Sequence, residues 1–241
     1  MTDLISSSLE AGVLTLTLGN GIAHPLSLPM IRALHGALDA PEARVIVIHG
    51  PGHIFCAGHD LKEIARHRAA PDRGAAFLTE LFDACAALMI AIARSPVPVL
   101  AQVEGIATAA GLQLVAACDL AFAADSARFC LPGVRNGGFC TTPAVAVARA
   151  IGRKAVNDLL LSGEDRDAAW ALRVGLVTEV HPPADLPGRV TAFARTLAGR
   201  NPTPIREGRA CLSAHMELPL EQAYALAGPV MVRHFLDEGR L

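Results

Sequence analysis

The chain has 241 residues, of which 52% are hydrophobic and 18% are charged, and its formal net charge is −2. This length suits one domain, or a domain with an appendage, and is ample for a sizeable core. The charge excludes a large nucleic-acid-binding surface, which would need a basic face or stripe. Because charged residues fall below the usual quarter, we expect extra buried surface, such as an oligomer interface.

The first half of the chain alternates predicted strands with predicted helices. Period-two alternation or continuous apolar runs predict strands at Val13–Leu18, Val45–His49, Val97–Val103 and Leu120–Ala123. Apolar residues at helical spacing predict helices at Leu28–Leu38, Asp72–Arg94 and Gly111–Cys118, with residues 105–110 as a loop. This order favours an α/β fold with right-handed crossovers and largely parallel strand pairing.

After Pro132 the pattern predicts helices only. They are expected at Pro143–Arg149, Arg153–Leu161, Ala168–Val174, Leu186–Ala198, Pro204–Glu217 and Leu220–Phe235. The last of them form a helical region that packs on something, either its own domain or a neighbour.

Cysteine usage and the N-terminal residues predict a cytoplasmic protein. None of the six cysteines forms a C-x-x-C pair or has histidines at zinc-ligand spacing, so we expect a reducing compartment, no disulfide framework and no metal. The first residues, MTDLISSSLEAG, show no export or organelle signal. The apolar stretch Ser95–Asp119 is interrupted by prolines and polar residues, so we expect no membrane span there.

Two loops stand out because each brings small residues to the start of a helix. Phe55–Glu63 (FCAGHDLKE) follows the predicted strand Val45–His49, and Gly105–Gly111 (GIATAAG) follows Val97–Val103. Small residues allow a ligand to approach the main chain, and free N–H groups at a helix start favour developing negative charge. Two such donors on one oxygen would form an oxyanion hole. Taken alone, each loop is a weak signal, because small-residue turns between a strand and a helix usually serve only tight packing.

These motifs resemble the crotonase (enoyl-CoA hydratase/isomerase) superfamily. FCAGHDLKE is followed by VEGIATAAGLQLVAACDLAFAADSARFCLPGV, and AIGRKAVNDLLLSGE and ALRVGLVTEVHP continue the family pattern. The resemblance extends from about Ser8 to Arg240. The motifs AGHDLKE, ATAAGLQL and FCTTP are most similar to those of the branch called enoyl-CoA hydratase domain-containing protein 3.

The resemblance implies a crotonase (ClpP/crotonase-like) α/β spiral of ββα units over residues 1–185, with a C-terminal helical oligomerisation region over 186–241. It implies an acyl-CoA thioester as substrate, with coenzyme A as part of the substrate and no separate cofactor. A homotrimer or a dimer of trimers is expected. The motif positions assign the two oxyanion-hole N–H groups to His59 and Ala110. The substrate-binding residues implied are Cys56, Ala57, Gly58, Lys62, Gly111 and Gly133.

Two positions depart from the family pattern. Hydratases of the family use two carboxylates to add water, and the matching positions here are Gln113 and Gly133. An amide does not titrate and glycine has no side chain, so neither can act as a general acid or base. Gln113 is either a hydrogen-bonding group for water or a substrate carboxylate, or a satisfied structural amide.

Other groups are candidates to replace the carboxylates. The His59 side chain titrates near neutrality when unperturbed, although its N–H alone would serve the oxyanion hole. Cys140 is a candidate for a thiol of lowered pKa, and Thr142 for the cap of a helix with Pro143 at its first position. Arg135 and Asn136 are candidates to bind an acidic acyl group.

The sequence leaves three hypotheses for the function. The first is an acyl-CoA-processing enzyme that hydrates slowly or instead decarboxylates, hydrolyses a thioester or isomerises. The second is a non-catalytic acyl-CoA binder. The third is RNA binding by the basic cluster of Lys62, Arg66, His67, Arg68 and Arg73, which ordinary helix-surface solvation explains more simply. We therefore expect no nucleic-acid partner and no membrane.

Overall fold

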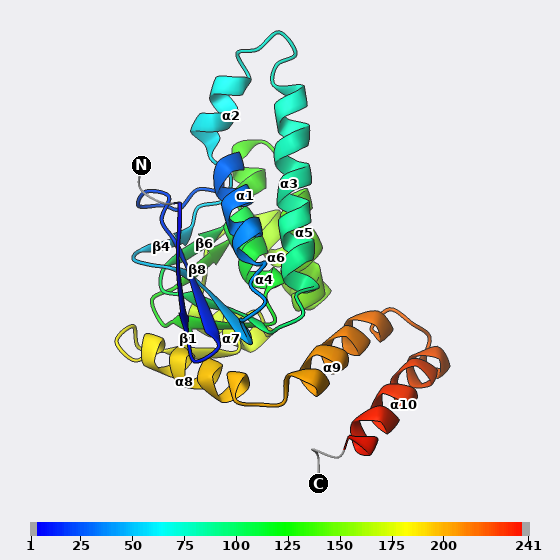
Figure 1. Cartoon of the computed structure of the whole chain (residues 1–241). Helices are drawn as coiled ribbons and strands as arrows, with labels where there is room; N and C mark the ends of the chain where they lie inside the picture. The colour runs from blue at the N-terminus through cyan, green and yellow to red at the C-terminus, as the bar shows by residue number, and fades with distance from the viewer. Residues whose placement is uncertain (1–3, 238–241) are drawn as a thin grey trace.

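A computed structural model describes residues 4–237. Residues 1–3 and 238–241, which belong to the two predicted regions, lie outside the described part. Two sheets and a set of covering helices form the body, and two further helices extend from it (Figure 1).

The larger sheet has six strands in the order β1-β2-β3-β5-β7-β10. They are β1 (Ile5–Glu10), β2 (Val13–Leu18), β3 (Val45–Gly50), β5 (Val99–Val103), β7 (Leu120–Ala124) and β10 (Glu179–His181). β1 pairs with β2 antiparallel, and every other pair in this sheet is parallel. The predicted parallel pairing is therefore confirmed.

The smaller sheet consists of strands that the sequence pattern did not predict. β4 (Ile54–Cys56), β6 (Ile106–Thr108) and β8 (Arg128–Cys130) run parallel, and β9 (Arg166–Asp167) pairs antiparallel with β8. The prediction that residues 105–110 form only a loop was wrong, because β6 lies there. The prediction of helices alone after Pro132 was also wrong, because β9 and β10 follow it. Strands of two or three residues are too short to show a period.

Each strand of the larger sheet that precedes the site is followed by a strand of the smaller sheet and then by a helix. β3, β4 and α2 (Leu61–His67) form one such unit, and β5, β6 and α4 (Ala110–Ala117) form the next. Gly50 and Gly105 lie where the chain passes from the larger sheet to the smaller one. A Cβ at Gly50 would lie 2.2 Å from the Phe55 oxygen, and one at Gly105 would lie 2.2 Å from the His53 carbonyl carbon. This repeat is the expected spiral of ββα units.

Helices cover both faces of the larger sheet. The main core includes residues of α1 (Leu28–Ala37), α3 (Ala75–Ala93), α4 and α6 (Arg153–Ser162), and a second apolar cluster lies under α8 (Leu186–Ala198). The remaining body helices are a 3₁₀ turn at Pro132–Asn136, α5 (Thr141–Ala150) and α7 (Ala168–Val174). Among the described helices, α3 alone is long and apolar enough to span a membrane, with a mean hydropathy of 1.9. Its buried residues pack toward the core, which accounts for part of that hydropathy.

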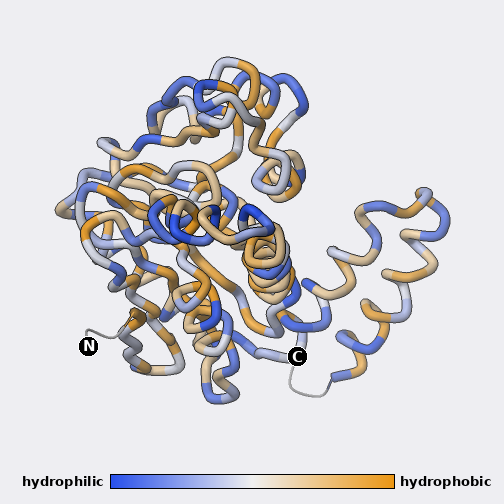
Figure 2. Tube along the Cα trace, turned by 90° about the horizontal axis from the view of Figure 1, so that it is seen from above, coloured by the Kyte–Doolittle hydropathy of each residue, from blue (hydrophilic) through white to orange (hydrophobic). Residues whose placement is uncertain are grey.

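The helices α9 (Pro202–His215) and α10 (Leu220–Leu236) form an arm that extends from the body (Figures 1 and 2). They pack on each other, and no residue of either helix is buried. Large apolar side chains on the arm are exposed, among them Leu212, Met216, Leu220, Tyr224, Met231 and Leu236. Arg209 joins the root of the arm to the body through Asp119 and the Ser95 carbonyl.

Candidate active site

The two loops singled out from the sequence are in direct backbone contact. A Cβ at Gly58 would lie 3.1 Å from the Ala110 nitrogen, and a Cβ at Gly111 would lie 2.1 Å from the Cys56 oxygen. Gly58 also has a φ of +83°, in the left-handed region that favours glycine. Only glycine permits this approach, so the structure brings Cys56, Gly58, Ala110 and Gly111 to one place.

Backbone strain marks the start of α4. Ala109 has φ 53° and ψ −121°, a conformation that normally selects glycine, and its N–H donates to the Cys130 carbonyl of β8 (3.0 Å). Strain of this kind persists only where the surrounding structure enforces it. Ala110 therefore begins the helix with its nitrogen beside Gly58, and no carbonyl within residues 4–237 accepts its N–H.

The N–H groups of His59 and Ala110 both lack an acceptor within residues 4–237. His59 is held in place by its neighbours, because the Leu26 N–H donates to the Gly58 carbonyl (2.7 Å) and the Asp60 N–H donates to the Leu26 carbonyl (3.4 Å). The bridge to Leu26 leaves the His59 N–H unused. Two unpaired donors thus lie on two loops that touch.

The His59 side chain is neutral at physiological pH. Burial lowers the pKa of its imidazole to about 4. Its ring lies edge-on to Phe82 of α3, with 5.1 Å between ring centroids, and its buried Nε2 has no partner among the described residues. The imidazole can therefore accept or donate a single hydrogen bond here but does not supply a permanent charge.

We expect acid to destabilise the protein through His59. The pKa of the folded state, about 4, lies below the unfolded value near 6.5, so the unfolded chain takes up the proton first as the pH falls. The contribution of His59 to the free energy of unfolding is fully present above pH 6.5 and is lost progressively toward pH 4. The slope from this group is up to about 1.4 kcal/mol per pH unit. Urea unfolding of wild type and His59→Gln at several pH values measures this slope. An equal slope in both proteins would contradict the assignment.

Gln113 of α4 presents an unsatisfied acceptor. Its side chain is 4% exposed, and its Oε1 has no hydrogen-bond partner in the described part of the chain. A buried amide oxygen without a hydrogen-bond partner lowers the stability of the folded chain. A bound molecule with a donor group would satisfy this atom.

Gly133 is sterically reserved for glycine. A Cβ there would lie 2.7 Å from the Cys140 nitrogen and 2.9 Å from the Phe139 carbonyl carbon. A carboxylate side chain at this position would require the backbone around Phe139 and Cys140 to move. The absence of the second carboxylate is therefore coupled to the local path of the chain.

The expected roles at the start of α5 were wrong. The helix begins at Thr141 with Cys140 as its N-cap residue, so Thr142 does not cap it and Pro143 is not its first residue. Burial raises the pKa of the Cys140 thiol rather than lowering it. Cys140 is consequently a poor nucleophile.

The remaining predicted ligand-contact residues differ in their surroundings. Cys56 is fully buried, its Sγ donates to the His24 carbonyl, and its carbonyl group and Cβ lie against Gly111 of the neighbouring loop. Ala57 donates its N–H to the Ala23 carbonyl (3.0 Å). Lys62 is exposed on the first turn of α2, and Arg135 donates to the Gly163 carbonyl (3.3 Å).

Sequence patterns did not predict the residues that hold the site residues in position. Glu63 is buried and accepts a hydrogen bond from the Leu28 N–H (2.9 Å), which ties α2 to α1. Phe82 and Leu26 position His59, and Ala109 carries the strain. The sequence offered one signal for Glu63: it lies three residues after Asp60, a spacing that is typical of the start of a helix.

The enoyl-CoA hydratase/isomerase family model matches residues 10–238. The chain belongs to this family. A crystal structure of an enoyl-CoA hydratase/isomerase family protein from Silicibacter pomeroyi is 59% identical, with a TM-score of 0.92, and covers 96% of this chain and 100% of that chain. The crystal structure of human enoyl-CoA hydratase domain-containing protein 3 is 35% identical, with a TM-score of 0.92, over 99% of this chain and 94% of that one.

Sequence comparison places the same branch among the relatives of this crotonase. The mitochondrial enoyl-CoA hydratase domain-containing protein 3 of Rattus norvegicus is 38% identical over 234 residues, which are 95% of this chain and 76% of the relative. The protein of Xenopus laevis is 39% identical over 238 residues, or 97% of this chain and 79% of the relative. The predicted family, branch and crotonase fold are confirmed.

Proposed function

We propose that this crotonase binds an acyl-CoA thioester and polarises its carbonyl between the N–H groups of His59 and Ala110. The observation that carries this proposal is that neither donor has an acceptor in the described part of the chain and that both lie on loops in backbone contact. Two such donors stabilise the negative charge that develops on a thioester oxygen, each worth roughly 10²–10³ in rate. Coenzyme A enters as part of the substrate, and no further cofactor is required for this step.

We propose a reaction other than efficient two-carboxylate hydration. Gln113 cannot exchange a proton and Gly133 has no side chain, so each missing acid or base costs about 10²–10⁴ in rate. Polarisation of the thioester carbonyl is sufficient for decarboxylation, because loss of CO2 leaves an enolate whose oxygen the two N–H groups stabilise. Thioester hydrolysis or isomerisation would in addition need a group that moves a proton, from the substrate, from water or from elsewhere in the site. Gln113 Oε1 then accepts a hydrogen bond from the substrate or from a water molecule that the substrate brings into the site.

A panel of acyl-CoA substrates tests the proposal. We expect slow turnover of crotonyl-CoA and faster turnover of a malonyl-type or other acyl-CoA, as measured by product analysis on the purified protein. A CoA-dependent rise in melting temperature without any turnover would favour the non-catalytic binder instead. Neither turnover nor a rise would contradict both functions.

The CoA moiety is proposed to follow the backbone of Cys56–Gly58, with Lys62 toward its phosphates. Lys62→Ala should raise KM for an acyl-CoA and leave kcat unchanged, because a phosphate contact binds substrate and transition state equally. A change in kcat alone would contradict this role.

We propose that the exposed apolar face of the arm is covered by another copy of the chain, in a homotrimer or a dimer of trimers. Exposed apolar patches of this extent are typical of interaction surfaces. Sedimentation of the intact protein measures the state, and a stable monomer contradicts the proposal. A cytoplasmic location stays a prediction, and the curated relatives carry "mitochondrial" in their names.

A further inference from the structure

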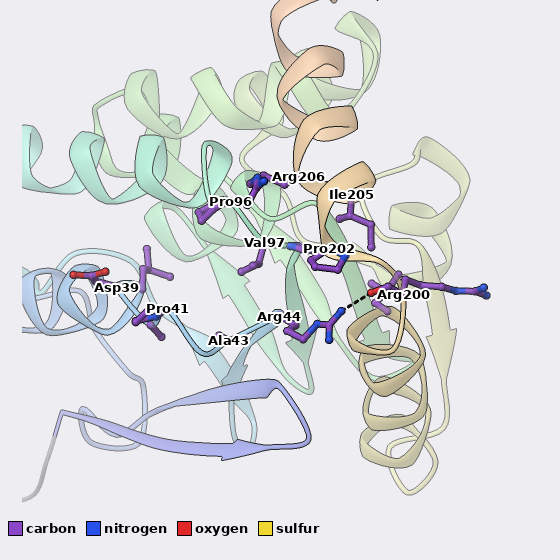
Figure 3. A pocket seen from close by; sticks show the side chains of 14 residues that line it. Asp39, Pro41, Ala43, Arg44, Pro96, Val97, Arg200, Pro202, Ile205 and Arg206 are labelled. Atoms are coloured by element: carbon purple, nitrogen blue, oxygen red, sulfur yellow. Dashed lines mark hydrogen bonds between the residues drawn. The ribbon is translucent and has the colours of Figure 1, made fainter. Parts of the chain in front are cut away.

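A cavity of about 510 Å³ lies where the arm joins the body (Figure 3). Its walls include Arg44 just before β3, Pro96–Pro98 just before β5, and Pro202, Ile205 and Arg206 at the start of α9. The His59 and Ala110 loops follow the carboxyl ends of the same two parallel strands. The cavity is therefore at the opposite edge of the sheet from the candidate active site.

Two arginines give the cavity a positive charge. Neither Arg44 nor Arg206 pairs with a carboxylate within residues 4–237. Arg44 Nη2 donates to the Arg200 carbonyl (2.6 Å), which fixes its side chain and leaves its other donors free. The Arg200 side chain extends away from the other labelled residues, and Asp39, the one acid in the lining, lies at the far end (Figure 3).

Much of the rest of the lining is apolar. Pro41, Pro96, Val97, Pro202 and Ile205 supply side chains without donors or acceptors. A volume of about 510 Å³ is within the usual range for small-molecule sites, which combine an apolar lining with a few placed polar groups. An inorganic anion would make no apolar contacts with the walls, and a neutral apolar ligand would not pair with the charge of the arginines.

We propose that this cavity binds an amphipathic organic anion, with its acidic group toward Arg44 and Arg206 and its apolar body against the proline-lined wall. One arginine belongs to the body and the other to α9, so the ligand bridges the two. Such a ligand adds to the existing contacts of Arg44 with Arg200 and of Arg209 with Asp119. Its binding stabilises the arm against the body.

Titration calorimetry with octanoate tests the site, and octanol serves as the uncharged probe of similar shape. We expect octanoate to bind the wild type and the double variant Arg44→Gln/Arg206→Gln to bind it about tenfold more weakly or worse, because charge-assisted hydrogen bonds are lost. The matched control is Arg153→Gln/Arg173→Gln, which removes two exposed arginines elsewhere on the body and should bind as the wild type does.

Several results would overturn the proposal. These are no octanoate binding by the wild type, equal binding by the Arg44/Arg206 double variant, or octanol binding as tight as that of octanoate. Equal binding by the double variant would place octanoate elsewhere, including the acyl site. Melting temperatures of all variants establish that each is folded. None of these results depends on acyl-CoA turnover, so this test is independent of the proposed function.

Discussion

Gln113→Glu is expected to raise crotonyl-CoA hydration about 10²-fold over the wild type. The substitution keeps the size of a side chain that is 4% exposed and places a titratable group where the amide oxygen has no partner. General acid–base groups contribute about 10²–10⁴ in rate, and we expect the lower end because Gly133 still supplies no carboxylate. Burial raises the pKa of a carboxyl group, so the new glutamate should also shift the pH profile of hydration upward.

The matched control is Gln113→Leu, which has a similar volume and cannot exchange a proton. It should leave hydration at or below the wild-type rate while retaining acyl-CoA binding in a thermal-shift measurement. The assay is the loss of enoyl-thioester absorbance over a range of pH. A Gln113→Glu protein that binds acyl-CoA normally and hydrates no faster than the wild type would show that position 113 does not face the reacting atoms.

Restoring the second carboxylate is not a useful companion experiment. A side chain at Gly133 would collide with the backbone of Phe139 and Cys140. A Gly133→Glu protein would therefore report on loop displacement as well as on chemistry, and the single change at Gln113 is the cleaner test.

Gly111→Ala is expected to lower the free energy of unfolding by about 3 kcal/mol and to slow turnover about 10²–10³-fold. The added Cβ would lie 2.1 Å from the Cys56 oxygen, so one of the two loops must move. Overpacking of this kind costs about 1–3 kcal/mol and occasionally more, and here the obstructing atom belongs to the backbone. Separating the loops also moves the Ala110 N–H away from that of His59, and the loss of one oxyanion donor costs about 10²–10³ in rate.

Gly36→Ala provides the control for this substitution. Gly36 lies in α1 with nothing within 4 Å of its Cβ position, so alanine there should be stabilising by about 0.5–1 kcal/mol through helix propensity. Urea unfolding and a turnover assay on both variants measure the difference. Gly111→Ala with the stability and activity of Gly36→Ala would contradict the proposed contact between the loops.

Long periodic segments were predictable from the sequence. β2, α7 and α8 have the predicted bounds, and β3, β5 and α4 differ from the predicted ranges by one or two residues. These segments carry enough residues to show a period of two or 3.6, and their order implied parallel pairing through right-handed crossovers. The motifs that resemble the crotonase family predict His59, Ala110, Gln113 and Gly133 as site positions, and their roles stay predictions.

Only the tertiary structure decided which of these residues meet and how each is buried and hydrogen-bonded. The strands β4, β6 and β8 are three residues long and exist because they pair with one another across long stretches of sequence. That pairing presses Gly111 against Cys56, strains Ala109 and leaves two N–H groups unpaired. Burial lowered the pKa of His59 and raised that of Cys140. The amino-acid identities were set by the sequence, whereas distance, burial and hydrogen-bond satisfaction depend on segments that meet only in the folded chain.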